Sequence, residues 1–218
     1  MLDYSFSLPA DPTDGAPVIV LLHGRGSNKS DLMGLRPGLP PEAIVVTPQA
    51  PFPGAQWGYG GGWAWYKYLG GTTPDPDTFL AGQAQLDEFL ADLPQILPVK
   101  PGPIVIGGFS QGATSSLAYA LRHPGTFAGV LIFSGFLADH PSVAATPETV
   151  AGTRFFWGHG HNDPMISHPT GEQGRAALRA AGADLTTGDY PIGHSIDPGE
   201  LNDASTWLSE LFAGVSAR

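Results

Sequence analysis

The sequence contains no cysteine among its 218 residues. This absence excludes disulfide bonds, metal sites built from thiolates, and a cysteine nucleophile. Any covalent catalysis would therefore need another side chain, of which serine is one candidate.

Long hydrophobic runs are also missing. Asp3, Asp11 and Asp14 interrupt the N-terminal region, which therefore does not match a secretory signal peptide. No apolar stretch reaches the length of a membrane-spanning helix. We therefore expect no stable membrane insertion and a cytoplasmic location.

Basic residues are scarce. The chain has 10 Lys and Arg against 20 Asp and Glu, a formal net charge of −10. A nucleic-acid interface would need a basic stripe, and docking on anionic lipid would need positive charge, so we expect neither. With 42% hydrophobic and 14% charged residues, the composition is that of an ordinary globular protein, and the length predicts one domain over residues 1–218.

Short apolar runs alternate with helical repeats along the whole chain. The expected strands are residues 4–8, 18–22, 43–47, 104–106, 128–133, 154–157 and 184–190. The expected helices are residues 77–97, 113–121, 169–181 and 197–212, with a short helix after residues 30–31. This alternation predicts an α/β fold with a mainly parallel sheet of about seven strands and helices on both faces. Ligands of such sheets bind beyond the carboxyl ends of the strands.

Residues 108–112, Gly-Phe-Ser-Gln-Gly, separate a β-branched run from an Ala- and Leu-rich helical segment. A Gly-x-Ser-x-Gly pattern between a strand and a helix is the context of a nucleophile elbow. Such a turn is tight, so side chains at 108 and 112 would clash, which explains the glycines. We expect Ser110 to be a nucleophile held in a strained conformation. A glycine-rich turn with an incidental serine would leave the flanking strand and helix unexplained.

A nucleophilic serine needs a base, and the base needs an acid to orient it. In this kind of fold the chain order is serine, acid, histidine. Of the six histidines after Ser110, His194 follows a strand on a loop, and we expect it to be the base. We expect His123 to interact with a helix C-terminus, and His140 and His168, beside prolines, to be solvated.

Asp163 follows the strand 154–157 and is the expected acid. Four further aspartates could take this role. These are Asp139, Asp184, Asp189 and Asp197. Asp184 and Asp189 flank a strand, and Asp197 is typical of a helix N-cap.

An oxyanion formed at Ser110 would need two backbone donors. The N–H of Gln111, at the start of the helix, is one candidate. Arg25, in the loop after the strand 18–22, is placed to supply the other, with Gly24 and Gly26 allowing the backbone to bend. A plain turn is a second interpretation of this loop.

Residues 49–73 form a long Gly-, Pro- and aromatic-rich loop without helical or strand periodicity. Loops of this length in compact domains are usually functional or disordered, and large aromatic residues argue against disorder. We expect this loop to form one wall of a substrate site, through Trp57, Trp63 and Trp65, with Phe136 and Leu137 on another wall. Structural packing explains these aromatic residues equally well.

One competing pattern points to metal chemistry. His159, His161 and Asp163 have the His-x-His-x-Asp spacing of some binuclear metal hydrolases, which carry a further histidine directly after the aspartate. Here that position is Pro164, and a metal site would leave the elbow unexplained. We therefore expect no metal and no other cofactor, and keep a metal-dependent hydrolase as a competing hypothesis.

Several motifs together resemble one known family. They are Leu21-Leu22-His23-Gly24-x-Gly26, Gly107-Gly108-Phe109-Ser110-Gln111-Gly112-Ala113, Phe133-Ser134-Gly135, His159-Gly160-x-x-Asp163-Pro164 and Gly193-His194. In kind and order they resemble the carboxylesterase/acyl-protein thioesterase (phospholipase/carboxylesterase) family of α/β-hydrolases. The resemblance implies an α/β-hydrolase without a lid domain. It also implies a Ser110–Asp163–His194 triad, with the N–H groups of Arg25 and Gln111 as oxyanion hole.

Two features depart from that family, the glycine-heavy loop at residues 49–73 and Arg25, where thioesterases commonly have an apolar residue. The expected function is a serine hydrolase for small carboxylic esters with short to medium acyl chains. Thioesters and lysophospholipids are further candidate substrates. The motifs are also compatible with an acyltransferase or perhydrolase on the same scaffold, and with a non-enzymatic interaction module. The sequence neither requires nor excludes a homodimer.

Overall fold

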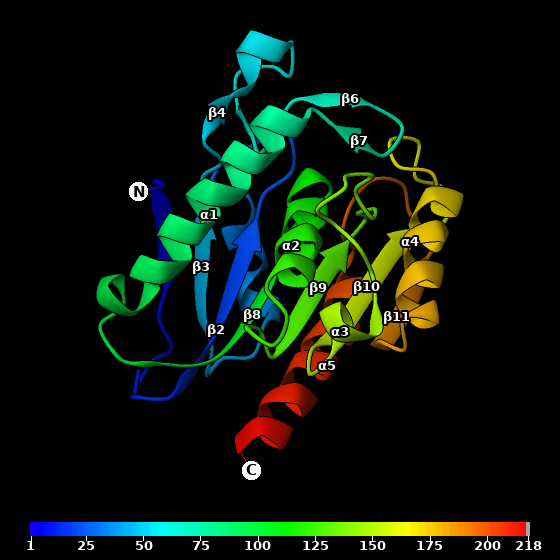
Figure 1. The fold of residues 1–218 in the computed structure, drawn as a ribbon. Helices are drawn as coiled ribbons and strands as arrows, with labels where there is room; N and C mark the ends of the chain where they lie inside the picture. The colour runs from blue at the N-terminus through cyan, green and yellow to red at the C-terminus, as the bar shows by residue number, and fades with distance from the viewer. Residues whose placement is uncertain (217–218) are drawn as a thin grey trace.

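The computed structural model describes residues 1–216, and its centre is a seven-stranded sheet (Figure 1). The strands are β1 (Tyr4–Ser7), β2 (Ala16–Leu22), β3 (Ile44–Pro48), β8 (Pro101–Phe109), β9 (Gly129–Phe133), β10 (Arg154–Gly160) and β11 (Asp184–Tyr190). Their spatial order is β1-β3-β2-β8-β9-β10-β11. Only β1 pairs in an antiparallel manner within this sheet, and every other pairing is parallel. The expected mainly parallel sheet of about seven strands is confirmed.

Helices cover both faces of the sheet, as expected for parallel strands that are apolar throughout. The helices are η1 (Leu32–Gly38), α1 (Pro76–Ile96), α2 (Gln111–Arg122), α3 (Pro147–Val150), α4 (His168–Ala180) and α5 (Pro198–Ser216). The sheet residues Val18 and Val20 face a core that includes Phe89 of α1 and Leu117 of α2. The other face packs against α5 and η1, which lie behind the sheet in the view of Figure 1.

Local sequence explains where α1 and α5 begin. The side chain of Asp75 accepts a hydrogen bond from the N–H of Thr78 at 3.0 Å, and Pro76 occupies the first turn of α1. Asp197 accepts from the N–H of Glu200 at 2.8 Å at the start of α5, in agreement with its expected capping role.

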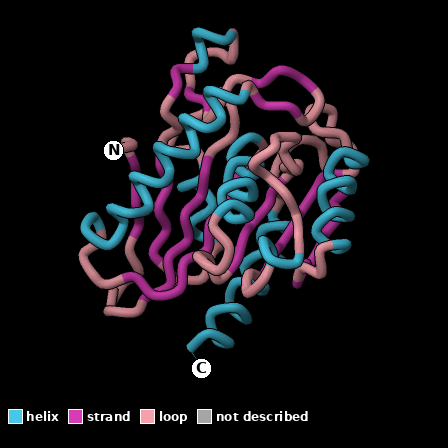
Figure 2. Tube along the Cα trace, viewed as in Figure 1, coloured by secondary structure: helices cyan, strands magenta, loops and turns pink. Residues whose placement is uncertain are grey.

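Residues 49–75 are more ordered than the expected irregular loop. They contain β4 (Phe52–Pro53), η2 (Gly54–Trp57), β5 (Trp63–Ala64), β6 (Tyr68–Gly70) and β7 (Thr73–Pro74). The pairs β4–β5 and β6–β7 form two small antiparallel sheets. Figure 2 shows these short strands above the carboxyl ends of the main strands, where a ligand site is expected.

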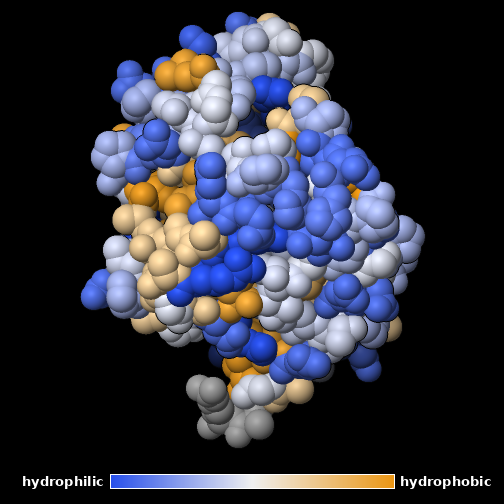
Figure 3. Space-filling model, turned by 90° about the vertical axis from the view of Figure 1, so that its right-hand side faces the viewer, coloured by the Kyte–Doolittle hydropathy of each residue, from blue (hydrophilic) through white to orange (hydrophobic). Residues whose placement is uncertain are grey.

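Within the described part of the chain, no helix has both the length and the apolar character needed to cross a membrane. The face viewed in Figure 3 is mostly hydrophilic, with smaller apolar areas between the polar residues.

Candidate active site

Ser110 lies at the junction of β8 and α2. Its backbone has φ 56° and ψ −118°, a conformation that non-glycine residues rarely adopt. Its N–H donates to the carbonyl oxygen of Phe133 at 2.9 Å, which ties the turn to the end of β9. The structure therefore contains the strained strand-to-helix turn that the sequence predicts.

The two glycines of the elbow are required by the neighbouring strand. A Cβ atom on either Gly108 or Gly112 would overlap the carbonyl oxygen of Leu22, the last residue of β2. The absence of both side chains lets α2 start directly against the end of β2, which places the elbow beside the loop that carries Arg25.

The structure brings Ser110, His194 and Asp163 together. Ser110 and His194 are 84 residues apart in the sequence, and Asp163 and His194 are 31 residues apart. His194 Nε2 lies 2.9 Å from Ser110 Oγ, and His194 Nδ1 lies 2.7 Å from Asp163 Oδ2. A carboxylate only accepts hydrogen bonds, so Nδ1 carries the proton and Nε2 is free to accept one from the serine hydroxyl.

Asp163 is buried, yet it is held in its charged form. Burial opposes ionisation, but the hydrogen bond from His194 and those from the N–H groups of Ile166 and Met165 outweigh it and lower the pKa of Asp163. The backbone donors lie 2.9 and 2.8 Å from Oδ1. Asp163 is therefore a fixed negative charge against the imidazole of His194.

His159 is fully buried and supports the loop of Asp163. Its Nε2 donates to the carbonyl oxygen of Ile166 at 2.9 Å. Burial lowers the pKa of His159, so its ring is neutral. The oxygens of Asp163 accept hydrogen bonds from the backbone and from His194, and within residues 1–216 the ligand atoms of His159, His161 and Asp163 are not grouped closely enough to form a candidate metal site.

A different group could hold a metal ion, namely His161, His168 and Asp189, whose candidate ligand atoms all lie within 4.8 Å of one another. Among residues 1–216 this is the one group of that kind, and Asp163 is not part of it. Asp189 already accepts from His168 at 2.8 Å and from buried Arg175 at 2.6 Å.

The two expected oxyanion donors are the N–H groups of Gln111, the first residue of α2, and Arg25. Within the described residues, neither N–H donates to another protein group. Backbone hydrogen bonds hold the Arg25 loop in place, from Gly26 N–H to the Trp63 oxygen at 2.8 Å and from Trp63 N–H to the Ser27 oxygen at 2.7 Å. Arg25 and Gln111 both line the pocket at Ser110.

The buried ring of His23 stabilises the loop that carries Arg25. Its Nδ1 donates to the Gly24 oxygen at 2.8 Å, and its Nε2 accepts from the N–H of Ala50 at 3.1 Å. Burial lowers the pKa of His23, and both ring nitrogens are occupied. His23 directly follows β2, and its two hydrogen bonds assign it the role of a positioning residue for the loop that carries Arg25.

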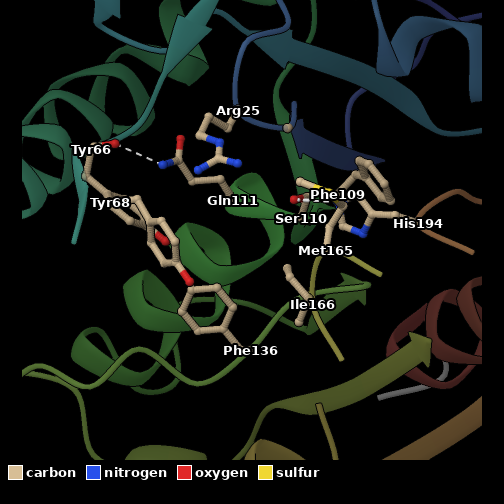
Figure 4. Close-up of a pocket in the computed structure, with 11 residues that line it drawn as sticks. Arg25, Tyr66, Tyr68, Phe109, Ser110, Gln111, Phe136, Met165, Ile166 and His194 are labelled. Carbon is tan, nitrogen blue, oxygen red and sulfur yellow. Dashed lines mark hydrogen bonds between the residues drawn. The ribbon is translucent and has the colours of Figure 1, made fainter. Parts of the chain in front are cut away.

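The side chain of Gln111 ties the elbow to the aromatic segment. Its Oε1 accepts from the N–H of Trp65 at 2.8 Å, and its Nε2 donates to the Tyr66 oxygen at 2.9 Å, the dashed line in Figure 4. From the sequence, only the backbone of Gln111 is expected to contribute to the site. The local pattern carries no signal for the side-chain contact, because the partners lie about 45 residues away.

A pocket of about 160 Å³ opens beside Ser110. Its apolar walls come from Tyr66, Tyr68, Phe109, Phe136, Met165 and Ile166 (Figure 4). The volume is below the ~300–1,000 Å³ of pockets for drug-sized ligands, which favours a small group. Sequence reasoning missed most of these residues, because only contacts between distant loops bring them together.

Four of the five expected substrate-binding residues do not line this pocket, and only Phe136 does. Trp65 is buried and donates through Nε1 to the His23 oxygen at 2.9 Å. Trp63 pairs with Ser27 in the loop before η1.

Trp57 packs between the rings of Phe52 and Tyr59. Leu137 lines a separate hollow. The three tryptophans thus support the segment above the strands, which corrects their expected place in the wall of the pocket.

Three other histidines make structural contacts. His140, expected to be solvated, is buried with its ring centroid 4.9 Å from that of Phe79. His168 is hydrogen-bonded to Asp189. His123, at the end of α2, contacts the Tyr119 oxygen at 2.9 Å, which fits its expected role at a helix C-terminus.

Comparison with known proteins yields a family and a fold. Residues 9–212 match the phospholipase/carboxylesterase family model. Carboxylesterase SOBER1 from Arabidopsis thaliana is 32% identical over 119 residues, which cover 54% of this chain and 52% of that protein. An acyl-protein thioesterase 1 from Aspergillus fumigatus is 32% identical over 118 residues, covering 52% and 49%.

The chain spans about half the length of these curated relatives. The crystal structure of esterase PE8 superposes with a TM-score of 0.77 at 27% identity, covering 96% of this chain and 99% of that one. This likeness and the sheet order confirm the expected α/β-hydrolase fold. The chain belongs to the phospholipase/carboxylesterase family.

Proposed function

We propose that this protein is a serine hydrolase that cleaves carboxylic esters through an acyl-enzyme on Ser110. The observation that carries the proposal is the continuous hydrogen-bonded chain from Ser110 Oγ through His194 to Asp163, at the wall of a pocket. The family membership supports the same class of reaction.

In the first half-reaction, His194 Nε2 takes the hydroxyl proton as Ser110 Oγ attacks the carbonyl carbon of the ester. The carbonyl oxygen becomes an oxyanion, which receives hydrogen bonds from the N–H groups of Gln111 and Arg25. His194 then gives its proton to the departing alcohol, and the acyl group remains on Ser110.

In the second half-reaction, His194 Nε2 takes a proton from water, whose oxygen attacks the acyl carbon. Collapse of this second tetrahedral intermediate releases the carboxylic acid and restores the serine hydroxyl. Asp163 stabilises the imidazolium in both halves, and its low pKa keeps it charged for this role. Apart from the ester and water, every group that acts in these steps is a side chain or backbone N–H group of the protein.

The pocket supports short to medium acyl chains, because its volume is about 160 Å³ and its walls are largely apolar. Thioesters can react by the same steps and are included in the proposal. Acyl transfer and perhydrolysis would differ only in what attacks the acyl-enzyme. No contact in the described structure favours them over water.

Labelling with a serine-directed phosphonate, followed by mass spectrometry of the peptide with Ser110, tests the nucleophile. We expect the label on Ser110, and a fall in kcat of roughly four to six orders of magnitude in Ser110→Ala with a p-nitrophenyl ester. Ser209→Ala, on the exposed side of α5, is a matched control that should keep both labelling and turnover. Turnover by Ser110→Ala close to the wild type, or loss of activity with a chelator, would contradict the proposal.

A further inference from the structure

The guanidinium group of Arg25 is a cation at the pocket without a carboxylate partner. Of the other described arginines, Arg154, Arg175 and Arg179 pair with Asp or Glu side chains. No ion pair or hydrogen bond involves the side chain of Arg25 within residues 1–216, and it is exposed. No Asp or Glu is among the residues that line the pocket.

Two tyrosine rings hold this cation in place. The guanidinium carbon of Arg25 lies 4.7 Å from the ring centroid of Tyr59 and 5.5 Å from that of Tyr68. The hydroxyl of Tyr59 accepts from the N–H of Tyr68 at 2.7 Å, so the two rings are fixed relative to one another. Contact with ring faces orients the guanidinium while leaving its charge uncompensated and its N–H donors free.

The geometry also indicates which part of a substrate would meet Arg25. Its guanidinium lies on the same side of Ser110 as Gln111 and Tyr68, whereas His194 lies on the other side (Figure 4). His194 must protonate the departing oxygen, so the alcohol part of an ester lies beside His194. The carbonyl oxygen faces the N–H groups of Gln111 and Arg25. The acyl part takes the remaining direction, along the pocket wall past these donors, and extends toward Tyr68 and the guanidinium group of Arg25.

We propose that Arg25 binds a carboxylate on the acyl part of the substrate, so that half-esters of short dicarboxylic acids are preferred over neutral esters of the same length. This inference rests on the proposed function. The planar fork of a guanidinium matches a carboxylate through two parallel hydrogen bonds, and the small pocket fits a short acyl chain. In a protein of net charge −10, an unpaired cation at the pocket provides local attraction for an anionic substrate.

The test compares hydrolysis of monomethyl glutarate with that of methyl valerate, which has the same number of acyl carbons and no charge. The rate of acid release is measured by titration at constant pH for each ester. The readout is the ratio of the two kcat/KM values. We expect the wild type to favour the glutarate half-ester. Arg25→Gln should lower the ratio by about tenfold to a hundredfold, mainly through KM. Arg25→Lys keeps the charge and loses the planar guanidinium. Its kcat/KM ratio should lie between those of the wild type and Arg25→Gln.

Lys29→Gln is the matched control, because it removes one positive charge four residues away. The Lys29 ammonium pairs with Asp3 at 2.6 Å and does not line the pocket. This variant should keep the ratio of the wild type. The valerate ester of glycolic acid carries its carboxylate on the alcohol part. Its kcat/KM relative to methyl valerate should therefore be the same in the wild type and in Arg25→Gln.

An unchanged ratio in Arg25→Gln, or an equal loss with both methyl esters, would overturn the inference while leaving the serine hydrolase proposal intact. Dependence of the glycolate ester on Arg25 would overturn the acyl-side assignment. A binding measurement separates the two proposals. Calorimetric titration of Ser110→Ala should show glutarate binding more tightly than valerate, and the difference should disappear in Arg25→Gln/Ser110→Ala. Equal affinities for glutarate and valerate would also overturn the inference.

Discussion

The imidazole of His194 packs against the ring of Phe109, with the two ring centroids 4.6 Å apart and the planes inclined by 39°. Phe109 is the residue directly before Ser110. The elbow that presents the serine hydroxyl therefore also limits the position of the ring that would accept its proton.

Phe109→Ala should reduce kcat by roughly tenfold to a hundredfold, because it removes the surface that holds His194 and a displacement of about 1 Å can cost that much. KM should rise by a smaller factor, because Phe109 also lines the pocket. Steady-state kinetics with a p-nitrophenyl ester measures the effect. Phe109→Leu, which keeps an apolar side chain at this position, should recover part of kcat. If kcat is unchanged, the ring contact does not position the base.

Asp163→Asn should lower kcat by about four orders of magnitude while the protein remains folded, because an amide no longer fixes the proton on Nδ1 of His194. Asp184→Asn is the matched control. Asp184 pairs with Arg154 at the surface, where an ion pair contributes only about 0–1 kcal/mol, so this variant should keep its activity and stability. Comparable activity of the two variants would exclude the proposed role of Asp163.

Gly112→Ala should destabilise the protein by about 1–3 kcal/mol, because its Cβ overlaps the carbonyl oxygen of Leu22 and β2 or α2 must shift. The free energy of unfolding in urea measures this directly, and kcat should also fall because the elbow moves. Gly34→Ala provides the comparison, since no other group lies within 4 Å of its Cβ position and its φ is not in the left-handed region. Equal stability of both variants would refute the close-packed elbow.

Glu200 is buried in the first turn of α5, and neither of its carboxyl oxygens has a partner within the described residues. Burial, helped by the charge of Asp197, raises the pKa of Glu200 to about 8. The folded state therefore keeps a proton that the unfolded chain loses near pH 4.5. As pH rises from about 4.5 to 8, the unfolded state is progressively favoured, and the stability contributed by this group falls.

The stability of Glu200→Gln should therefore equal that of the wild type near pH 4 and exceed it at higher pH. Its advantage should grow to a few kcal/mol at most by pH 8 and then level off, since one pKa unit corresponds to about 1.4 kcal/mol. Thermal unfolding across this pH range is the measurement. Glu210→Gln, on the exposed side of the same helix, should show no such trend. A difference between Glu200→Gln and the wild type that does not vary with pH would contradict the assignment.

The sequence alone was informative wherever a short local pattern has one structural solution. The apolar runs within β2, β8 and β9 predicted strands, because short apolar runs bounded by turn residues are typical of strands buried in a parallel sheet. The glycines around Ser110 predicted the elbow, and the chain order after it pointed to Asp163 and His194. The structure brings these three side chains within hydrogen-bonding distance.

Only the tertiary structure decided the shape and charge of the pocket. Residues 49–73 have no periodicity, so their local sequence does not specify which aromatic side chains face inward. Contacts with distant residues decide it: Trp65 donates to the His23 oxygen, and the backbone of Trp63 pairs with Ser27. The same packing places Tyr59 and Tyr68 beneath Arg25. A linear pattern determined the elements and the reactive residue types, whereas the surroundings of each side chain depended on segments that meet only in the folded chain.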